Sequence, residues 1–365
     1  MQLASGSAST LLFQDQKKAM TRQAEKERDL LALNTREMLP PQRRRAKGAK
    51  RGRAKASAPR GFGAKSAPQQ GASERDLLHA EALATDGVCH LPDVLSKDAT
   101  AELLETVRDE LSRAYAAVEE DPASSVSRFN VPVETHDPLR GYLLLPLRDE
   151  ASVERGEPSG VLVSSLRRLL AKGSALSELF SLTCGGSDAE LYDIVALRTE
   201  PGAARQPIHY DTPYQKVPGL FCAFISLQDV RYNMGVTVFI PGTHKWSPER
   251  QAFEVGMEEK DAMLAKANSR YAQLRAGDAA FFDMRTLHAG TANLCAEEGG
   301  GQRFYLALTF RNRKAVEALG HAPNLRPGYR HRGISLQEVQ DELLTEAPFS
   351  GIASDGLPYG DGLQM

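Results

Sequence analysis

The sequence predicts a mainly β fold with flanking helices, in which antiparallel strands form a sandwich or barrel. Short β-type runs separated by turns begin near residue 189: "ELYDIVALRT", "LFCAFISLQDV", "GVTVFIPGTH", "GDAAFFDMRTLH" and "RFYLALTFRN". Strands at this spacing, with no long helical segments between them, are typical of antiparallel sheets and not of βαβ units. After "VTVFI", Pro241 and Gly242 suit the second and third positions of a type II turn.

Helical segments precede these strands. Ser73 is placed to cap a short helix, Asp86 and Gly87 form a turn, and residues 88–91 read as a short strand. Ser96 then caps a longer amphipathic helix that runs to about residue 118. Between residues 120 and 188, a loop-like "VSRFNVPVETHDPLRGYLLLP" is followed by a helical "GVLVSSLRRLLAKGSALSELFSL".

The composition divides the chain into three parts: an N-terminal extension (1–72), a folded domain (73–335) and a C-terminal extension (336–365). Within the first part, residues 15–38 are rich in helix formers and predict a possible helix, whereas 40–72 read as a disordered linker. We expect the N-terminal extension to be dispensable for the fold.

The linker contains a strongly basic run. Residues 43–65 carry ten Lys or Arg and no acid, so subtracting them from the formal net charge of −2 leaves −12 for the rest of the chain. This run fits a solvated spacer, a nuclear-localisation or nucleic-acid-binding patch, or an organelle transit peptide. Transit peptides are poor in acidic residues, so the acidic residues upstream argue against a transit peptide: Asp15, Glu25, Glu27 and Asp29.

The bulk composition bounds the class of protein. The 365 residues, 41 % of them hydrophobic, are enough for a real core, and no stretch is long and apolar enough to span a membrane. The four cysteines, Cys89, Cys184, Cys222 and Cys295, are far apart and match no metal or redox spacing. We expect an intracellular protein, in the cytoplasm by preference, or in an organelle or the nucleus through the extension; a monomer is favoured.

The stretch "HYD" carries the first candidate site residues, His209 and Asp211. Two residues apart on a strand, their side chains would share one face. Such a pair can bind a metal, relay a proton or simply lie on a wet strand surface. A third candidate ligand, His288 in "DMRTLHAGTAN", lies on a separate expected strand. Two imidazoles and one carboxylate on one face of a metal are the arrangement of non-heme Fe(II) oxygenases.

Arg303 begins the last strand of the expected core, "RFYLALTFRN". Residues 303, 305, 307 and 309 would form its more polar face, and the wholly apolar residues between them would form the other. Such a strand has a wet cavity on one side and packing on the other. An arginine that faces a cavity requires an anionic partner such as a carboxylate.

Together, "RQPIHYDTPYQ", "LFCAFISLQDV", "VTVFIPGTHKW", "GDAAFFDMRTLHAGTANL" and "RFYLALTFRN" resemble the phytanoyl-CoA dioxygenase family of Fe(II)- and 2-oxoglutarate-dependent oxygenases, over about residues 75–315. The resemblance implies a double-stranded β-helix core of the jelly-roll, cupin-like type. It also implies iron held by His209, Asp211 and His288, and 2-oxoglutarate whose distal carboxylate pairs with Arg303. With dioxygen, such an enzyme would hydroxylate a small-molecule substrate and release succinate and CO₂.

Two positions depart from the family pattern. The segment between His288 and Arg303 is lengthened by "CAEEGGGQ", which we interpret as a loop insertion. The position two after His288, often a serine that helps to hold the cosubstrate, is Gly290; the neighbouring Thr291 is a candidate substitute. Tyr192 is a further candidate cosubstrate contact, although packing is the commoner fate of a strand tyrosine.

Other polar residues are interpreted as structural. Asp283 lies five residues before His288, an odd offset that puts the two on opposite strand faces, so it is expected to form hydrogen bonds and not to bind the metal. His244 is expected to stabilise its turn or lie at the surface. The remaining histidines have no partner at ligand spacing: His79, His90, His136, His321 and His331.

Three functions therefore compete. The leading one is a 2-oxoglutarate-dependent hydroxylase acting on an acyl-CoA, an amino-acid-like compound or a natural product. A zinc hydrolase could use the same three ligands, but it lacks an evident general base and gives Arg303 no role. A non-catalytic binding module, directed to nucleic acid by residues 43–65, is the third.

Overall fold

The computed structural model describes residues 35–37, 74–146, 160–326 and 333–344. Its centre consists of two facing sheets, a six-stranded one in the order β2-β8-β5-β10-β4-β3 and a four-stranded one in the order β1-β7-β6-β9. The strands of the larger sheet are β2 (Val88–Leu91), β8 (Ala279–Asp283), β5 (Leu220–Ser226), β10 (Arg303–Arg311), β4 (Glu190–Thr199) and β3 (Arg140–Leu144). Those of the smaller sheet are β1 (Thr35–Glu37), β7 (Ser269–Ala272), β6 (Thr237–Phe239) and β9 (His288–Gly290).

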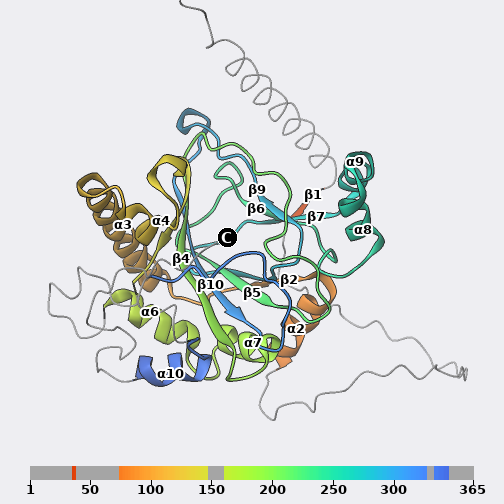
Figure 1. The fold of residues 1–365 in the computed structure, drawn as a ribbon, viewed down its shortest axis with the longest axis horizontal. Helices are drawn as coiled ribbons and strands as arrows, with labels where there is room; N and C mark the ends of the chain where they lie inside the picture. Colours follow the sequence, from red (N-terminus) through yellow and green to blue (C-terminus); the bar gives the residue numbers. More distant parts are fainter. Residues whose placement is uncertain (1–34, 38–73, 147–159, 327–332, 345–365) are drawn as a thin grey trace, which may run out of the picture.

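All strand pairs except β1–β7 are antiparallel, and a hydrophobic cluster drawn from both sheets fills the space between them. This is the jelly-roll, cupin-like core that the sequence predicts. The outer face of the six-stranded sheet is covered by helices that share its second hydrophobic cluster (Figure 1): α3 (Lys97–Glu120), α6 (Val161–Leu170), α7 (Ala175–Cys184) and α10 (Leu336–Leu344).

The remaining helices lie at the margins of the sheets. Helix α2 (Glu74–Asp86) contacts β2, and α4 (Ser124–Phe129) contacts β3. Helices α8 (Pro248–Val255) and α9 (Met257–Lys266) form the connection between β6 and β7. Two short 3₁₀ helices occur in loops, η1 (Val133–Thr135) and η2 (Ala296–Glu298).

The alternation expected along β10 is confirmed. Phe304, Leu306, Leu308 and Phe310 belong to the cluster under the helices, whereas Arg303, Tyr305, Ala307 and Thr309 line the space between the sheets. The strand register extends this alternation sideways into rows of side chains. One row joins Arg140, Thr199 and Arg303, and another, three rows away, joins Asp193, Thr309 and Cys222.

Several local expectations are confirmed. The Ser96 hydroxyl accepts a hydrogen bond from the Ala99 N–H at 3.3 Å and caps α3. Gly242 has a φ of +82°, as the third position of a type II turn requires. Helices α6 and α7 occupy the segment that reads as helical. The expectation of a loop is wrong at the end of the loop-like stretch, where residues 140–144 form strand β3. This strand provides hydrogen-bond partners for the backbone groups at the edge of β4.

The chain ends also differ from the expectation. Thr35–Glu37 form a strand parallel to β7, so the helix expected over 15–38 is wrong at this end; the open edge of β7 offers its backbone groups there. The rest of the N-terminal extension, with its basic run, and the expected helix cap Ser73 lie outside the described residues. Beyond residue 335 the core continues, because Leu336 and Val339 of α10 are buried in it.

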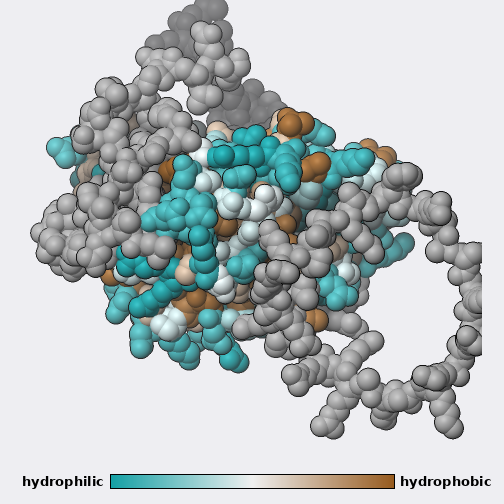
Figure 2. All heavy atoms as spheres, turned by 90° about the horizontal axis from the view of Figure 1, so that it is seen from below, coloured by the Kyte–Doolittle hydropathy of each residue, from teal (hydrophilic) through white to brown (hydrophobic). Residues whose placement is uncertain are grey.

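On the face seen in Figure 2, hydrophilic and hydrophobic residues are interspersed over the described part of the surface. Within the described residues, the four cysteines form no disulfide, and three of them are buried.

Replacing Phe310 by alanine should lower the free energy of unfolding by about 3–5 kcal/mol, because a fully buried ring would leave a cavity. Its centroid lies 4.4 Å from that of Phe180, so the loss falls where α7 packs on the sheet. Chemical denaturation measures the change. Val316→Ala is the control, since Val316 is 90 % exposed and its replacement should have no measurable effect; equal effects of the two would contradict the assigned packing.

Candidate active site

His209, Asp211 and His288 converge between the two sheets. Their potential ligand atoms all lie within 4.8 Å of one another. Nε2 of His209 is 3.6 Å from Oδ1 of Asp211, and Nε2 of His288 is 3.4 Å from Oδ2 of the same carboxylate. Neighbouring ligands of an octahedral ion with bonds of ~2.1 Å are ~3 Å apart, so small movements would bring all three onto one metal. The donor set therefore fits a divalent transition metal.

Backbone hydrogen bonds fix both imidazoles with the same nitrogen toward the centre. Nδ1 of His209 is 2.9 Å from the Pro207 carbonyl, and Nδ1 of His288 is 2.9 Å from the Thr286 carbonyl. Each Nδ1–H therefore donates to a carbonyl and leaves the Nε2 lone pair for a metal. Burial lowers the pKa of His288, which keeps this imidazole in the neutral form that a ligand requires.

The "HYD" segment is not a regular strand, which corrects one expectation. His209 forms a single antiparallel bridge with His288, through N–H···O=C bonds of 2.9 and 2.8 Å. Prolines at 207 and 213 flank the segment and cannot donate to a sheet, which limits the pairing. Asp211 is held instead by its own N–H, which donates to the Met284 carbonyl at 3.1 Å.

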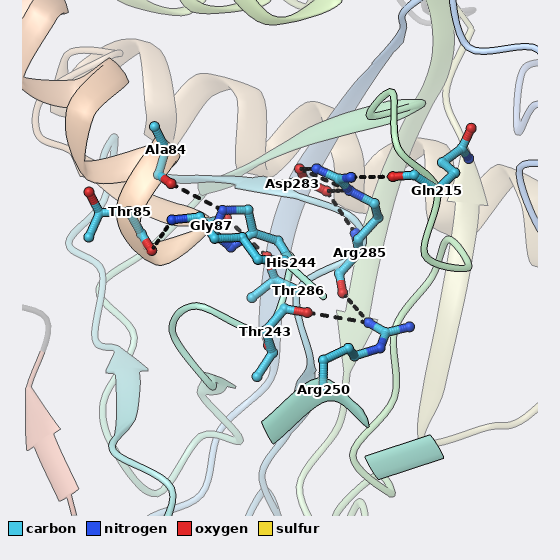
Figure 3. A network of polar contacts seen from close by, with 11 residues as sticks. Ala84, Thr85, Gly87, Gln215, Thr243, His244, Arg250, Asp283, Arg285 and Thr286 are labelled. Atoms are coloured by element: carbon cyan, nitrogen blue, oxygen red, sulfur yellow. Dashed lines mark hydrogen bonds and ion pairs between the residues drawn. The ribbon is translucent and has the colours of Figure 1, made fainter. Parts of the chain in front are cut away.

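A buried ion pair joins the two segments that carry the ligands (Figure 3). Nη2 of Arg285 and Oδ2 of Asp283, both on the segment that leads to His288, are 2.6 Å apart. Nη1 of Arg285 donates to the Gln215 carbonyl at 2.5 Å and so joins this segment to the one that follows His209 and Asp211. Arg250, fully buried, donates to the Arg285 carbonyl at 2.7 Å. Asp283 is thus a structural hydrogen-bond acceptor, as expected from its offset to His288.

The second feature of the site is a pair of arginines. Nη2 of Arg303 donates to the Thr199 hydroxyl at 2.8 Å, and Nη1 of Arg140 lies 3.5 Å from the same oxygen. Arg303 is buried, and among the described residues its Nε and the neighbouring Tyr305 hydroxyl have no hydrogen-bond partner. Burial lowers the pKa of Arg303, and burial together with Arg303 lowers that of Arg140 to about 10. Buried cations require an anion, so this end of the cavity fits a carboxylate.

Gly290 makes room for Arg140. A Cβ on residue 290 would lie 2.8 Å from Nη1 of Arg140 and 2.8 Å from Oε1 of Gln206. Gln206 accepts from the Gly290 N–H at 2.9 Å, and Arg140 donates to the Thr291 carbonyl at 2.8 Å. The guanidinium therefore occupies the space that a side chain at 290 would need, which explains the departure from the family serine.

The triad and the arginines line one cavity of about 440 Å³. Its wall is formed mainly by β3, β4 and β10, and its opposite side includes Thr237 of β6 and Gly290 of β9. A volume of this size holds a small cosubstrate together with part of a substrate.

Three expected residues are placed elsewhere. Tyr192 does not line the cavity; its hydroxyl donates to the His321 carbonyl at 2.5 Å, so the expected cosubstrate contact is corrected to a structural one. Thr291 does not line it either, and its contribution is the carbonyl that holds Arg140. His244 is buried and not at the surface, with Nε2 3.3 Å from the Ala84 carbonyl beside α2 (Figure 3).

The sequence interpretation missed Arg140, Gln206 and Asp193, all of which line the cavity. A signal for Arg140 was present, because "RGYLLL" begins with an arginine and continues as a short apolar run of strand type. His321, interpreted as ordinary, also lines the cavity.

The fold and the site define a non-heme, metal-dependent enzyme of the jelly-roll class. A family model, phytanoyl-CoA dioxygenase (PhyH), matches residues 83–297, more than half of the chain. The chain belongs to this family, whose members depend on Fe(II) and 2-oxoglutarate.

Several solved structures have similar folds. The 2-oxoglutarate-dependent epimerase SnoN of nogalamycin biosynthesis is 19 % identical, with 69 % of this chain and 92 % of that chain covered and a TM-score of 0.45. The carbocyclase SnoK is 15 % identical (69 % and 94 % covered, TM-score 0.43). HygX from Streptomyces hygroscopicus, solved with nickel and 2-oxoglutarate, is 13 % identical (67 % and 94 % covered, TM-score 0.42). No curated protein matches the chain.

In the part of the chain that the structure describes, every helix is too short or too polar to cross a bilayer.

Replacing His209, Asp211 or His288 by alanine should abolish binding of one Fe(II) per chain while the protein still folds, because the sheets form through backbone and apolar contacts. Anaerobic metal titration followed by calorimetry measures this loss. Asp283→Asn is the matched control: it removes another buried carboxylate near His288, and it should lower stability while metal binding persists. Loss of metal in this control but not in Asp211→Ala would reverse the assignment of the carboxylate ligand.

Arg303→Ala should weaken 2-oxoglutarate binding by about two to four decades, since two charge-assisted hydrogen bonds at ~1.5–3 kcal/mol each are lost. Arg140→Ala, which removes the more peripheral guanidinium, should cost about one to two decades. The visible charge-transfer band of the Fe(II)–2-oxoglutarate chelate reports the affinity. Arg311→Ala, at the far end of β10, is the control and should leave the 2-oxoglutarate affinity unchanged. An affinity in Arg303→Ala equal to that of the parent would refute the carboxylate site.

Proposed function

We propose that this chain is a hydroxylase that inserts one oxygen atom from O₂ into an unactivated C–H bond of a small-molecule substrate, with conversion of 2-oxoglutarate to succinate and CO₂. The observation that carries the proposal is the pairing of a His-Asp-His site with two arginines, the buried Arg303 and the half-buried Arg140, in one cavity. The first suits Fe(II), and the second suits the distal carboxylate of 2-oxoglutarate.

Each residue has a separate role in this proposal. His209, Asp211 and His288 would hold the iron on one face and leave its other positions open to the cosubstrate and O₂, which together supply the oxidising chemistry. Arg303 would bind the distal carboxylate, with Arg140 and the Thr199 hydroxyl beside it. Asp211 favours hydroxylation over halogenation, because its carboxylate takes the place that a halide would need.

The enclosed position of Arg303 serves orientation as well as charge. The side chain is 4 % exposed and its guanidinium lies 4.4 Å from the centre of the Tyr305 ring, so it cannot move far to follow a ligand. A cosubstrate fixed at this end can reach the triad in few orientations. Less orientational entropy of the cosubstrate then has to be lost before it meets the metal.

The zinc hydrolase alternative explains less of the cavity. It would use the three ligands, but it leaves the buried Arg303 and the neighbouring Arg140 without an anion, at a cost in stability that other contacts would have to offset. The nucleic-acid-binding alternative rests on residues 43–65, which lie outside the described residues, and it gives the cavity no role.

Incubation of the Fe(II) enzyme with 2-oxoglutarate and a metabolite library under ¹⁸O₂ tests the proposal. We expect substrate-dependent succinate release and a product that has gained one labelled oxygen atom. A product that forms without gaining oxygen would instead indicate an epimerase or a cyclase. Tight zinc binding with ester or amide hydrolysis in the absence of O₂ would establish the hydrolase.

A further inference from the structure

The cavity has a second polar end, opposite the arginines. The registers of β4 with β10 and of β10 with β5 place Asp193, Thr309 and Cys222 in one row across the larger sheet. Arg303 and Thr199 lie three rows away, and with ~6.8 Å for every two strand residues the two ends are ~20 Å apart. The rows between them contain Val195 and Ala307, then Leu197 and Tyr305.

Asp193 is buried, lines the cavity, and forms no ion pair with a lysine or arginine among the described residues. Its Oδ1 accepts a hydrogen bond from the Asn324 N–H at 2.8 Å, a neutral donor. Desolvation by burial raises the pKa of this carboxyl group, against smaller opposing effects of His321, Thr309 and Asn324. A buried carboxylate with only neutral donors would be stabilised by a cation.

His321 offers a second acceptor at the same end. Its Nδ1 is 2.9 Å from the Ala322 carbonyl, so that nitrogen carries the proton and donates. In a neutral imidazole Nε2 is then the acceptor, and this buried atom has no hydrogen-bond partner among the described residues. An ammonium group carries three N–H donors and no acceptor, which is the complement of a carboxylate beside an imidazole lone pair.

We propose that Asp193 and His321 form the substrate-recognition end of the cavity, and that the substrate is a small molecule bearing a protonated amine. This deepens the proposed function and rests on it, because it assumes that 2-oxoglutarate occupies the arginine end. The two ends then sort the two ligands by charge: the dianion goes to Arg303 and Arg140, and the amine goes to Asp193. Among the substrate classes open from the sequence, this favours amine-bearing metabolites over acyl-CoAs, whose phosphates and carbonyls would meet an acid.

The test uses matched four-carbon probes on the full-length enzyme: n-butylamine, n-butanol and butyrate. Each is titrated calorimetrically into the anaerobic Fe(II)–2-oxoglutarate enzyme and into Asp193→Asn, in which the amide oxygen can still accept from the Asn324 N–H. Asp188→Asn is the control, since it removes the same charge from an exposed position.

We expect the parent and Asp188→Asn to bind the amine at least about tenfold more tightly than the alcohol or the acid, and Asp193→Asn to lose about 10- to 100-fold in amine affinity. Equal binding of the three probes by the parent would overturn the proposal, and this comparison needs no variant to fold. Retention of the amine preference in Asp193→Asn would also overturn it.

Failure of the proposed function would be seen separately. The charge-transfer band of the parent with Fe(II) and 2-oxoglutarate is recorded before any probe is added, and its absence would reject the oxygenase. Titration of the amine into the enzyme without 2-oxoglutarate still measures the Asp193 end in that case.

Discussion

Two like charges beside one hydroxyl, the buried Arg303 and the half-buried Arg140, set the strongest constraint on this molecule. Arg140 and Arg303 approach the Thr199 oxygen from either side, and the described residues provide them with carbonyl and hydroxyl acceptors but no carboxylate. Their repulsion and desolvation oppose folding, so neighbouring contacts must hold both side chains in place. The strand register does so, because residues 140, 199 and 303 occupy one row of three adjacent strands.

The site depends on backbone geometry more than on side-chain packing. The bridge between His209 and His288 brings two distant segments together, and Arg285, paired with Asp283 on its own segment, joins them again by donating to the Gln215 carbonyl. Because both imidazoles are oriented by carbonyl groups two residues earlier, the ligand geometry follows from the local chain path. Metal can therefore bind to an arrangement that already exists, without ordering a loop at the cost of entropy.

Local periodicity predicted the strands of the core, and together with the family resemblance it selected the three candidate metal ligands that the structure brings together. The alternation of "RFYLALTFR" is visible without knowing its neighbours, and it assigned Arg303 to the cavity face correctly. The local pattern "RGYLLL" indicates a strand, but the place of Arg140 in the cavity depends on the pairing of that strand with β4, which is a long-range property. The prediction that Tyr192 contacts the cosubstrate was wrong for a related reason. The hydroxyl of Tyr192 donates to the His321 carbonyl, which is 129 residues away in the sequence.

Gly290 has a consequence for how the cosubstrate site can change. A side chain at 290 and a guanidinium from residue 140 compete for one space, since their atoms would lie 2.8 Å apart. The hydroxyl of a serine at 290 and the cation at 140 therefore compete as donors for one space. A side chain at 290 would require the ends of Arg140 and Gln206 to move away, so we expect the two positions to vary together among relatives. Glycine at residue 290 thus leaves space for a positive charge supplied by β3, a strand that carries none of the three candidate metal ligands.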